Sequence, residues 1–316
     1  MSYSIYRQTV SSLPLIVLQN NASGERVEIL PTLGGTIHRL ALNAGKGVEQ
    51  LLFCDADHEI EKNPKTRSRI LFPWNDRLPG ARFSFEGQTV QMTPDKGDGS
   101  KIHGLIRHAE MQELGSYSCE SYAAVLLGIS LARPEQYDGW PYPLRLEIDY
   151  RLEPQRLRLE FRVINEGQAK APFALGWHPY FTLGGKISET LLTLSGERVV
   201  EVGADLMPTG NLPAVKGTPL DFSKAKPIGK DELDIAIEAG DGVARLEREG
   251  KVIEIHQDSE FFEWFQLYTP EDGLSIAIEP VSGATDALNR PELGLAVLEP
   301  GDELLTWCEV RTGSAR

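Results

Sequence analysis

The chain has 316 residues, 41% of them hydrophobic and 25% charged, with 30 glycines and 20 prolines. This length allows one large globular domain or two modest ones, and the composition excludes disorder and a coiled coil. The formal net charge is −14 and no local basic patch offsets it, so the chain repels phosphate backbones and anionic lipid surfaces. We therefore expect no nucleic acid and no membrane among its partners.

The N-terminal segment and the cysteines both bear on the compartment. The apolar run from Leu13 to Leu18 has no basic region before it and is too short for a signal-peptide core or a membrane span. Cys54, Cys119 and Cys308 are widely spaced and form no CxxC pair, which is typical of small buried residues in a reducing compartment. These features predict a cytoplasmic protein.

Alternation of apolar and polar residues with a period of two dominates the chain and predicts antiparallel strands. Hairpins are expected at residues 83–92, at residues 144–163, where the pattern is clearest, and at residues 246–255. A further strand over residues 274–279 is expected to stop at Pro280, because proline has no N–H for the ladder.

Helical periodicity never persists over the roughly ten to twelve residues that an amphipathic helix needs, so we expect only short helical turns. No repeat, low-complexity tract or polar linker divides the sequence. Residues 1–316 are therefore predicted to form a single all-β domain, a large antiparallel β-sandwich.

Several motifs that indicate a particular chemistry are absent. The sequence has no GxGxxG or GxxxxGK[ST] phosphate loop, no GxSxG nucleophile turn and no HExxH zinc helix. His103 and His108 come closest to a metal pair, but their spacing puts them on opposite faces of a strand and on poorly matched faces of a helix. A metal site is therefore not expected.

Four segments place an ionisable residue among aromatic residues and glycines, a context typical of a sugar pocket. They cover residues 73–87, 102–108, 175–181 and 276–289, and they contain Arg77, His103, His178 and Glu279 respectively.

Three of these residues also have a purely structural interpretation. Glu279 ends a strand beside small residues, where a substrate can approach, but a carboxylate at a sheet edge in water fits the same pattern. His178, between Trp177 and Pro179, is either functional or a core histidine bonded to a backbone carbonyl. Arg77 lies either in a site loop or in a surface ion pair.

The same segments resemble the aldose 1-epimerase (galactose mutarotase-like) family. The likeness rests on the Asn-Arg loop followed by Gly-x-x-Phe-x-x-x-Gly, on the His-Gly and His-Pro-Tyr-Phe segments, and on the Glu-Pro segment leading to Asp-Ala-Leu-Asn. Residues 30–40 and 304–310 look like the family's first and last core strands. The resemblance implies a large antiparallel β-supersandwich that interconverts the α and β anomers of a free hexose such as galactose or glucose.

By this resemblance Glu279 is the general base and His178 the general acid. One base and one acid suffice for anomer exchange, so neither a cofactor nor a metal is expected. A histidine pKa near neutrality and a partly desolvated glutamate would give both groups usable protonation states. Trp74, Trp177 and Tyr180 are candidates for an apolar platform under the sugar, or for core aromatics.

Arg77 and His103 resemble the residues that hold the ring oxygen and hydroxyls of the sugar. The family also binds ring hydroxyls through an aspartate ahead of the base strand; Asp234 is our choice here, and Asp231 competes with it.

The chain departs from the family immediately before Arg77. Asp76 stands there, where the family commonly has asparagine, and Asn75 lies one position earlier. We include Asn75 among the expected substrate-binding residues.

Three other functions share parts of this pattern. A hexose-6-phosphate 1-epimerase would need extra cations, and Arg82 and Arg107 are near the site in sequence. A non-catalytic carbohydrate-binding protein of the same fold would not need an acid and a base together. A glycosidase needs two carboxylates across the glycosidic bond, whereas these segments offer one strong carboxylate. The expected partner is a small sugar, and the expected assembly is a monomer or homodimer.

Overall fold

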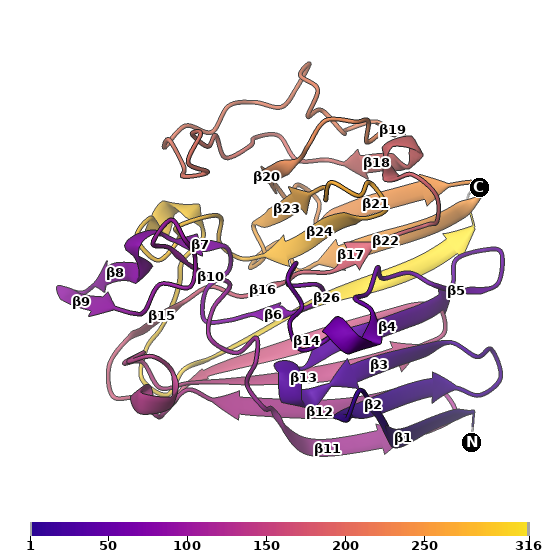
Figure 1. The fold of residues 1–316 in the computed structure, drawn as a ribbon, viewed down its shortest axis with the longest axis horizontal. Helices are drawn as coiled ribbons and strands as arrows, with labels where there is room; N and C mark the ends of the chain where they lie inside the picture. Colours follow the sequence, from indigo (N-terminus) through magenta and orange to yellow (C-terminus); the bar gives the residue numbers. More distant parts are fainter. Residues whose placement is uncertain (1, 315–316) are drawn as a thin grey trace.

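The hairpin of β13 (Leu144–Glu153) and β14 (Arg156–Asn165) follows directly from the sequence pattern. In both strands every second residue is buried and the residues between are partly exposed. The computed structural model describes residues 2–314, and Figure 1 shows antiparallel strands throughout. The hairpins predicted at residues 83–92 and 246–255 are also confirmed, as β8 with β9 and β21 with β22.

The largest sheet has nine strands in the order β11, β12, β13, β14, β26, β22, β21, β18, β19, and every neighbouring pair is antiparallel. The other members are β11 (Gln112–Ser118), β12 (Ala123–Ser130), β18 (Leu191–Leu194), β19 (Lys226–Pro227), β21 (Val243–Arg248), β22 (Lys251–Gln257) and β26 (Glu303–Ser314). The C-terminal strand β26 therefore lies between β14 and β22 and connects strands β11–β14 to the hairpin of β21 and β22.

Two further sheets lie over one side of this sheet (Figure 1). The N-terminal sheet contains, in order, β1 (Tyr3–Val10), β2 (Leu13–Asn20), β3 (Arg26–Leu30), β4 (Thr36–Asn43) and β5 (Val48–Gln50). The six-stranded sheet contains β20 (Asp234–Glu238), β23 (Trp264–Tyr268), β24 (Ile276–Val281), β16 (Gly176–Trp177), β17 (Tyr180–Phe181) and β6 (Ile70–Leu71). A bridge between Leu52 and Phe181 connects the two.

The remaining elements are short. Three two-stranded ladders pair β7 (Arg77–Leu78) with β10 (Lys101–Ile102), β8 (Arg82–Phe85) with β9 (Gln88–Gln91), and β15 (Ala171–Phe173) with β25 (Ala296–Leu298). Helical structure within residues 2–314 is confined to 3₁₀ turns: η1 (Pro31–Leu33), η2 (Asp57–Glu59), η3 (Pro79–Ala81), η4 (Pro134–Gln136), η5 (Ile187–Glu189) and η6 (Pro291–Leu293). None of these turns has the length and apolarity needed to cross a membrane.

One hydrophobic core draws on all three large sheets, and it sets the facing of the strands. Leu18 of β2, Leu159 of β14 and Ile278 of β24 belong to the same buried cluster. Burial of such side chains is the main favourable term in folding. Ile276 and Ile278 of β24 point into this core. Because side chains alternate along a strand, Glu279, which lies between Ile278 and Val281 in sequence, points to the opposite face of the six-stranded sheet.

The prediction that the strand stops at Pro280 is wrong, because β24 continues to Val281. Ser282, two residues further on, donates its N–H to Leu175, on the β16 side of β24. Because backbone N–H groups alternate between the two edges of a strand, the nitrogen of Pro280 faces the same side of β24 as the N–H of Ser282. On that side the hydrogen-bond ladder of β24 is interrupted between β16 and β17. A missing N–H is tolerated at that interruption.

Two smaller expectations also need correction. Residues 304–310 do lie in the last strand, β26, but residues 30–40 do not form the first strand, because β1 and β2 precede them. The three cysteines are free thiols; Cys308 is buried as predicted, whereas Cys54 and Cys119 are partly exposed.

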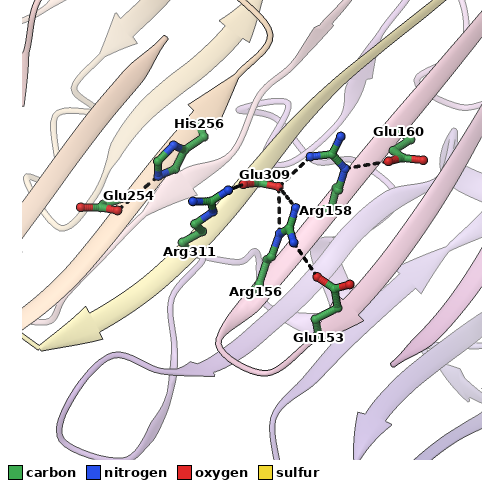
Figure 2. A network of polar contacts seen from close by, with 8 residues as sticks. All are labelled: Glu153, Arg156, Arg158, Glu160, Glu254, His256, Glu309 and Arg311. Carbon is green, nitrogen blue, oxygen red and sulfur yellow. Dashed lines mark hydrogen bonds and ion pairs between the residues drawn. The ribbon is translucent and has the colours of Figure 1, made fainter. Parts of the chain in front are cut away.

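On the outer face of the nine-stranded sheet, the fully buried carboxylate of Glu309 contacts several arginines (Figure 2). Glu309 accepts hydrogen bonds from Arg156 Nε at 2.8 Å and Arg158 Nη1 at 2.9 Å, and it also pairs with Arg311. The Arg158 guanidinium lies 4.3 Å from the ring centre of Trp307. Burial alone would raise the pKa of Glu309, but the hydrogen bonds from Arg156 and Arg158 outweigh burial and lower it.

Candidate active site

The four sequence segments converge on one pocket, on the face of the six-stranded sheet that points away from the core. Its volume is about 240 Å³. All six residues predicted for the site line it: Asn75, Arg77, His103, His178, Asp234 and Glu279. A small concave site with a few convergent polar groups is typical of small-molecule binding.

Glu279 lies at the bottom of this pocket. It sits in β24, which has neighbours on both sides, and only 3% of its surface is exposed, so the interpretation as an edge carboxylate in water is wrong. Burial raises the pKa of Glu279 well above its usual value, and the nearby carboxyls of Asp76 and Asp234 raise it further.

His178 is fixed by its backbone and faces Glu279 with its side chain. The N–H of Ser68 donates to the carbonyl of His178 at 2.7 Å, and the N–H of His178 donates to the carbonyl of Arg69 at 3.0 Å. Nδ1 of His178 lies 3.4 Å from Oε1 of Glu279 and has no hydrogen-bond partner among the described residues. This nitrogen therefore does not make the backbone bond of a core histidine.

The surroundings of His178 favour the neutral imidazole. The imidazole ring stacks on the Tyr180 ring, with 5.0 Å between centroids and 4° between planes. The Arg67 guanidinium lies 5.5 Å from the centre of the Tyr180 ring. Burial lowers the pKa of His178 to about 3, and the charge of Arg67 contributes to the decrease. This differs from the near-neutral value expected from sequence, because the sequence did not indicate how completely the ring is enclosed.

The carboxyl and the imidazole form a pair that holds one proton in either of two forms. The raised pKa of Glu279 and the lowered pKa of His178 both favour a neutral acid beside a neutral imidazole. A carboxylate beside an imidazolium contains the same number of protons. The two forms differ only in the position of one proton between groups 3.4 Å apart.

His103 and Arg77 flank this pair. The His103 ring meets that of His178 edge to face, with centroids 5.1 Å apart, and its Nδ1 has no hydrogen-bond partner within residues 2–314. Burial lowers the pKa of His103, and the neighbouring cationic side chains add to this. Arg77 lines the pocket and reaches outward to Asp98, with 3.2 Å between Nη1 and Oδ2.

Asp234 and Gln266 form a hydrogen-bonded unit beside Glu279. Nε2 of Gln266 donates to Asp234 at 2.8 Å, and the register places Gln266 opposite Glu279. Asp234 as a whole residue is exposed, but its carboxyl lies partly buried in the pocket. This burial and the charge of Asp76 raise the pKa of Asp234 to about 6. Asp231, the competing choice, does not line the pocket.

Sequence reasoning missed Gln266 and Thr285, which both line the pocket. A signal for Gln266 was available, since it is the one polar residue in the aromatic-rich strand Trp264–Tyr268. Thr285 follows the base strand in a turn and had no distinguishing pattern.

Asn75 is held firmly by the backbone of a distant segment. Its Nδ2 donates to the carbonyl of Gly283, and its Oδ1 is buried with no hydrogen-bond partner in the described part of the chain. Of the three proposed platform aromatics, Tyr180 lines the pocket. Trp74 and Trp177 do not; both belong to the core, where Trp74 packs on Trp140 and Trp177 on Phe181.

The two arginines considered from sequence as extra cations for a sugar phosphate lie outside the pocket. Lys65, Lys96 and Arg77 line it, whereas Arg82 and Arg107 do not. Arg107 is engaged by Asp95 at 2.6 Å. Within residues 2–314 no group of three or more His, Cys, Asp or Glu side chains is arranged to hold a metal ion.

Known proteins resemble this chain over most of its length. The sequence profile of the aldose 1-epimerase family matches residues 14–311. The chain is 26% identical over 303 residues to the uncharacterized protein YihR of Escherichia coli K12, covering 92% of this chain and 94% of that protein. It is 25% identical over 316 residues to human galactose mutarotase, covering 89% and 90%.

The fold also matches solved structures. A galactose mutarotase-like protein from Clostridium acetobutylicum superimposes with a TM-score of 0.84 at 16% identity, covering 99% of each chain. The predicted all-β fold, a large antiparallel sandwich of the galactose mutarotase-like type, is thereby confirmed. From the family profile over nearly its whole length, the chain belongs to the aldose 1-epimerase family.

Proposed function

We propose that this chain is an aldose 1-epimerase that interconverts the α and β anomers of a free hexose such as galactose or glucose. The observation that carries the proposal is the juxtaposition of Glu279 and His178, with 3.4 Å between carboxyl and imidazole in a small polar pocket. A binding protein would need neither the acid nor the base. The family membership supports the same reaction class.

Anomer exchange proceeds through the open-chain aldehyde. The Glu279 carboxylate takes the proton of the C1 hydroxyl while the bond between C1 and the ring oxygen breaks, and the ring oxygen takes a proton from the His178 imidazolium. Rotation about C1–C2 presents the other carbonyl face, and closure reverses both transfers. Each proton transfer by a positioned group contributes roughly 10²- to 10⁴-fold.

The charge of the pocket supports a neutral sugar over a sugar phosphate. The carboxyls of Asp76, Asp234 and Glu279 share the pocket with its cations, and Arg77 is already paired with Asp98. A phosphate placed here would meet acidic groups at close range. We therefore assign hydroxyl binding to four residues: Arg77, His103, Asp234 and Asn75.

Polarimetry on freshly dissolved α-D-glucose and α-D-galactose tests the proposal. We expect the protein to accelerate mutarotation, Glu279→Gln to lose roughly 10²-fold or more, and His178→Asn to lose a similar factor. His256→Asn is the matched control, since His256 bonds to Glu254 on the outer face of the nine-stranded sheet, away from the pocket.

Full activity of a folded Glu279→Gln variant would overturn the assignment of the base. A wild-type protein that binds either hexose without accelerating mutarotation would be a carbohydrate-binding protein instead. Faster turnover of glucose 6-phosphate than of glucose would establish a phosphorylated substrate.

A further inference from the structure

Asp76 is held at the pocket by its backbone. It adopts a left-handed conformation with φ of 55°, which aspartate and asparagine tolerate better than most residues. Its carbonyl accepts the N–H of His103 at 3.0 Å. The strand β7, which begins at Arg77, and the turn that carries His103 are thus joined through this residue.

The carboxyl of Asp76 is held from a third segment, because the Thr285 hydroxyl donates a hydrogen bond to its Oδ2. Both residues line the pocket together with Glu279 and Asp234. Arg77, the adjacent cation, also reaches outward to Asp98. The carboxyl of Asp76 therefore has the Thr285 hydroxyl, the backbone N–H of Arg77 and the shared charge of that arginine around it. Glu309, by contrast, has three arginines.

The titratable and charged side chains that line the pocket together with Asp76 come from several elements. They are Glu279 from β24, Asp234 from β20, Arg77 beside it, His103 and His178 from the adjacent turns, Tyr180 from β17, Tyr268 from β23, and Lys65 and Lys96 from the loops. Burial is the largest cause that raises the pKa of Glu279, and the charge of Asp76 is the second largest. The same two causes, in the same order, raise the pKa of Asp234. Burial also raises the pKa of Asp76 itself.

We propose that Asp76 is a positioning residue for the anomer exchange: from its fixed place in the pocket its charge opposes ionisation of Glu279 and so retains the proton shared by Glu279 and His178. The inference rests on the proposed function, since it assigns Asp76 a role through the general base.

The sign of the effect follows from the charge. A negative group beside the pair makes loss of its proton harder and gain of a second proton easier, so both transitions occur at higher pH. Replacing Asp76 with asparagine keeps the shape and the left-handed backbone but removes the charge. Both limbs of the pH profile of kcat/KM should then move to lower pH.

The experiment compares wild type, Asp76→Asn and the matched control Asp98→Asn. Asp98 bonds the same arginine but does not line the pocket. We expect the midpoints of kcat/KM for mutarotation to fall by about one pH unit in Asp76→Asn and to stay in place in Asp98→Asn. A uniform loss of rate with unchanged midpoints would indicate a merely structural role and overturn the proposal.

A second readout does not depend on activity. The infrared band of the protonated Glu279 carboxyl, identified by its absence in Glu279→Gln, should titrate at lower pH in Asp76→Asn. If the wild type fails to accelerate mutarotation, the proposed function fails, and this band alone decides whether Asp76 acts on Glu279. An unchanged titration of the band would overturn the inference whatever the activity.

Discussion

Glu279 and Glu309 are two glutamates at almost the same burial, 3% and 0% exposed, with opposite electrostatics. Glu309 has three arginines around it, which lower its pKa (Figure 2). The pKa of Glu279 is raised, first by burial and then by the two other carboxyls in its pocket, and no arginine among the described residues offsets these effects. Burial alone therefore does not determine the state of a carboxyl; the groups that share its space do.

Exchanging each glutamate for glutamine should separate catalysis from stability. Glu279→Gln is expected to lose roughly 10²-fold or more of the proposed mutarotation and to unfold no more easily than wild type, since a costly buried carboxyl is removed. Glu309→Gln is expected to keep its activity per folded molecule and to lose about 2 kcal/mol of unfolding free energy, because it leaves three arginines without their anion.

Polarimetry and urea unfolding on the same preparations measure both effects. A large loss of stability in Glu279→Gln, or a large loss of turnover in Glu309→Gln, would contradict the division of roles between the two faces.

The two sites should also respond to pH in opposite ways. The folded pKa of Glu309 lies below its ordinary 4.5, so its contribution to stability is present above about pH 4.5 and is lost as pH falls through the folded value. The folded pKa of Glu279 lies above 4.5, so its contribution is full below that value and is lost as pH rises.

Unfolding curves between about pH 2 and pH 8 test these signs. The deficit of Glu309→Gln relative to wild type should shrink toward the acid end, while any advantage of Glu279→Gln should grow toward the alkaline end. Parallel curves for wild type and both variants would show that neither glutamate has a shifted pKa.

The smallest expected effect concerns Trp307, whose ring supports the Arg158 guanidinium at Glu309. Trp307→Leu should lower the unfolding free energy by about 1 kcal/mol through loss of the cation–π contact. Leu305→Ala is the control, because Leu305 lies on the same strand and is 67% exposed. An equal loss in both variants would mean that the contact with Arg158 contributes nothing specific.

Strands and site segments were predictable from sequence to different degrees. Strict alternation over residues 144–163 placed both strands of that hairpin, because one face is buried throughout. Arg77, His103, His178 and Glu279 were recognisable as ionisable residues among aromatics and glycines, whereas Asn75 and Asp234 were added from the family resemblance. All six line one pocket. Gln266 and Thr285 were missed, and the choice between pocket and core for Trp74 and Trp177 stayed open, because the direction of a side chain depends on the tertiary structure around it.

The continuation of β24 through Pro280 was unpredictable for a related reason. Whether a missing N–H matters depends on the neighbouring strand, and here the neighbour is the discontinuous pair β16 and β17. The enclosure of His178 likewise comes from residues far along the chain, including Tyr180 and Arg67.

The pairing of β6, β16 and β24 has a consequence for how the protein reaches its active form. Leu71 pairs with Gly176, which pairs with Val281, so these three neighbouring strands lie about 100 residues apart in sequence. Hairpins such as β13 with β14 close short loops and can form early, whereas this sheet must close two long ones. We therefore expect the pocket to form late in folding, so that recovery of the proposed mutarotation after dilution from denaturant lags behind the return of strand structure.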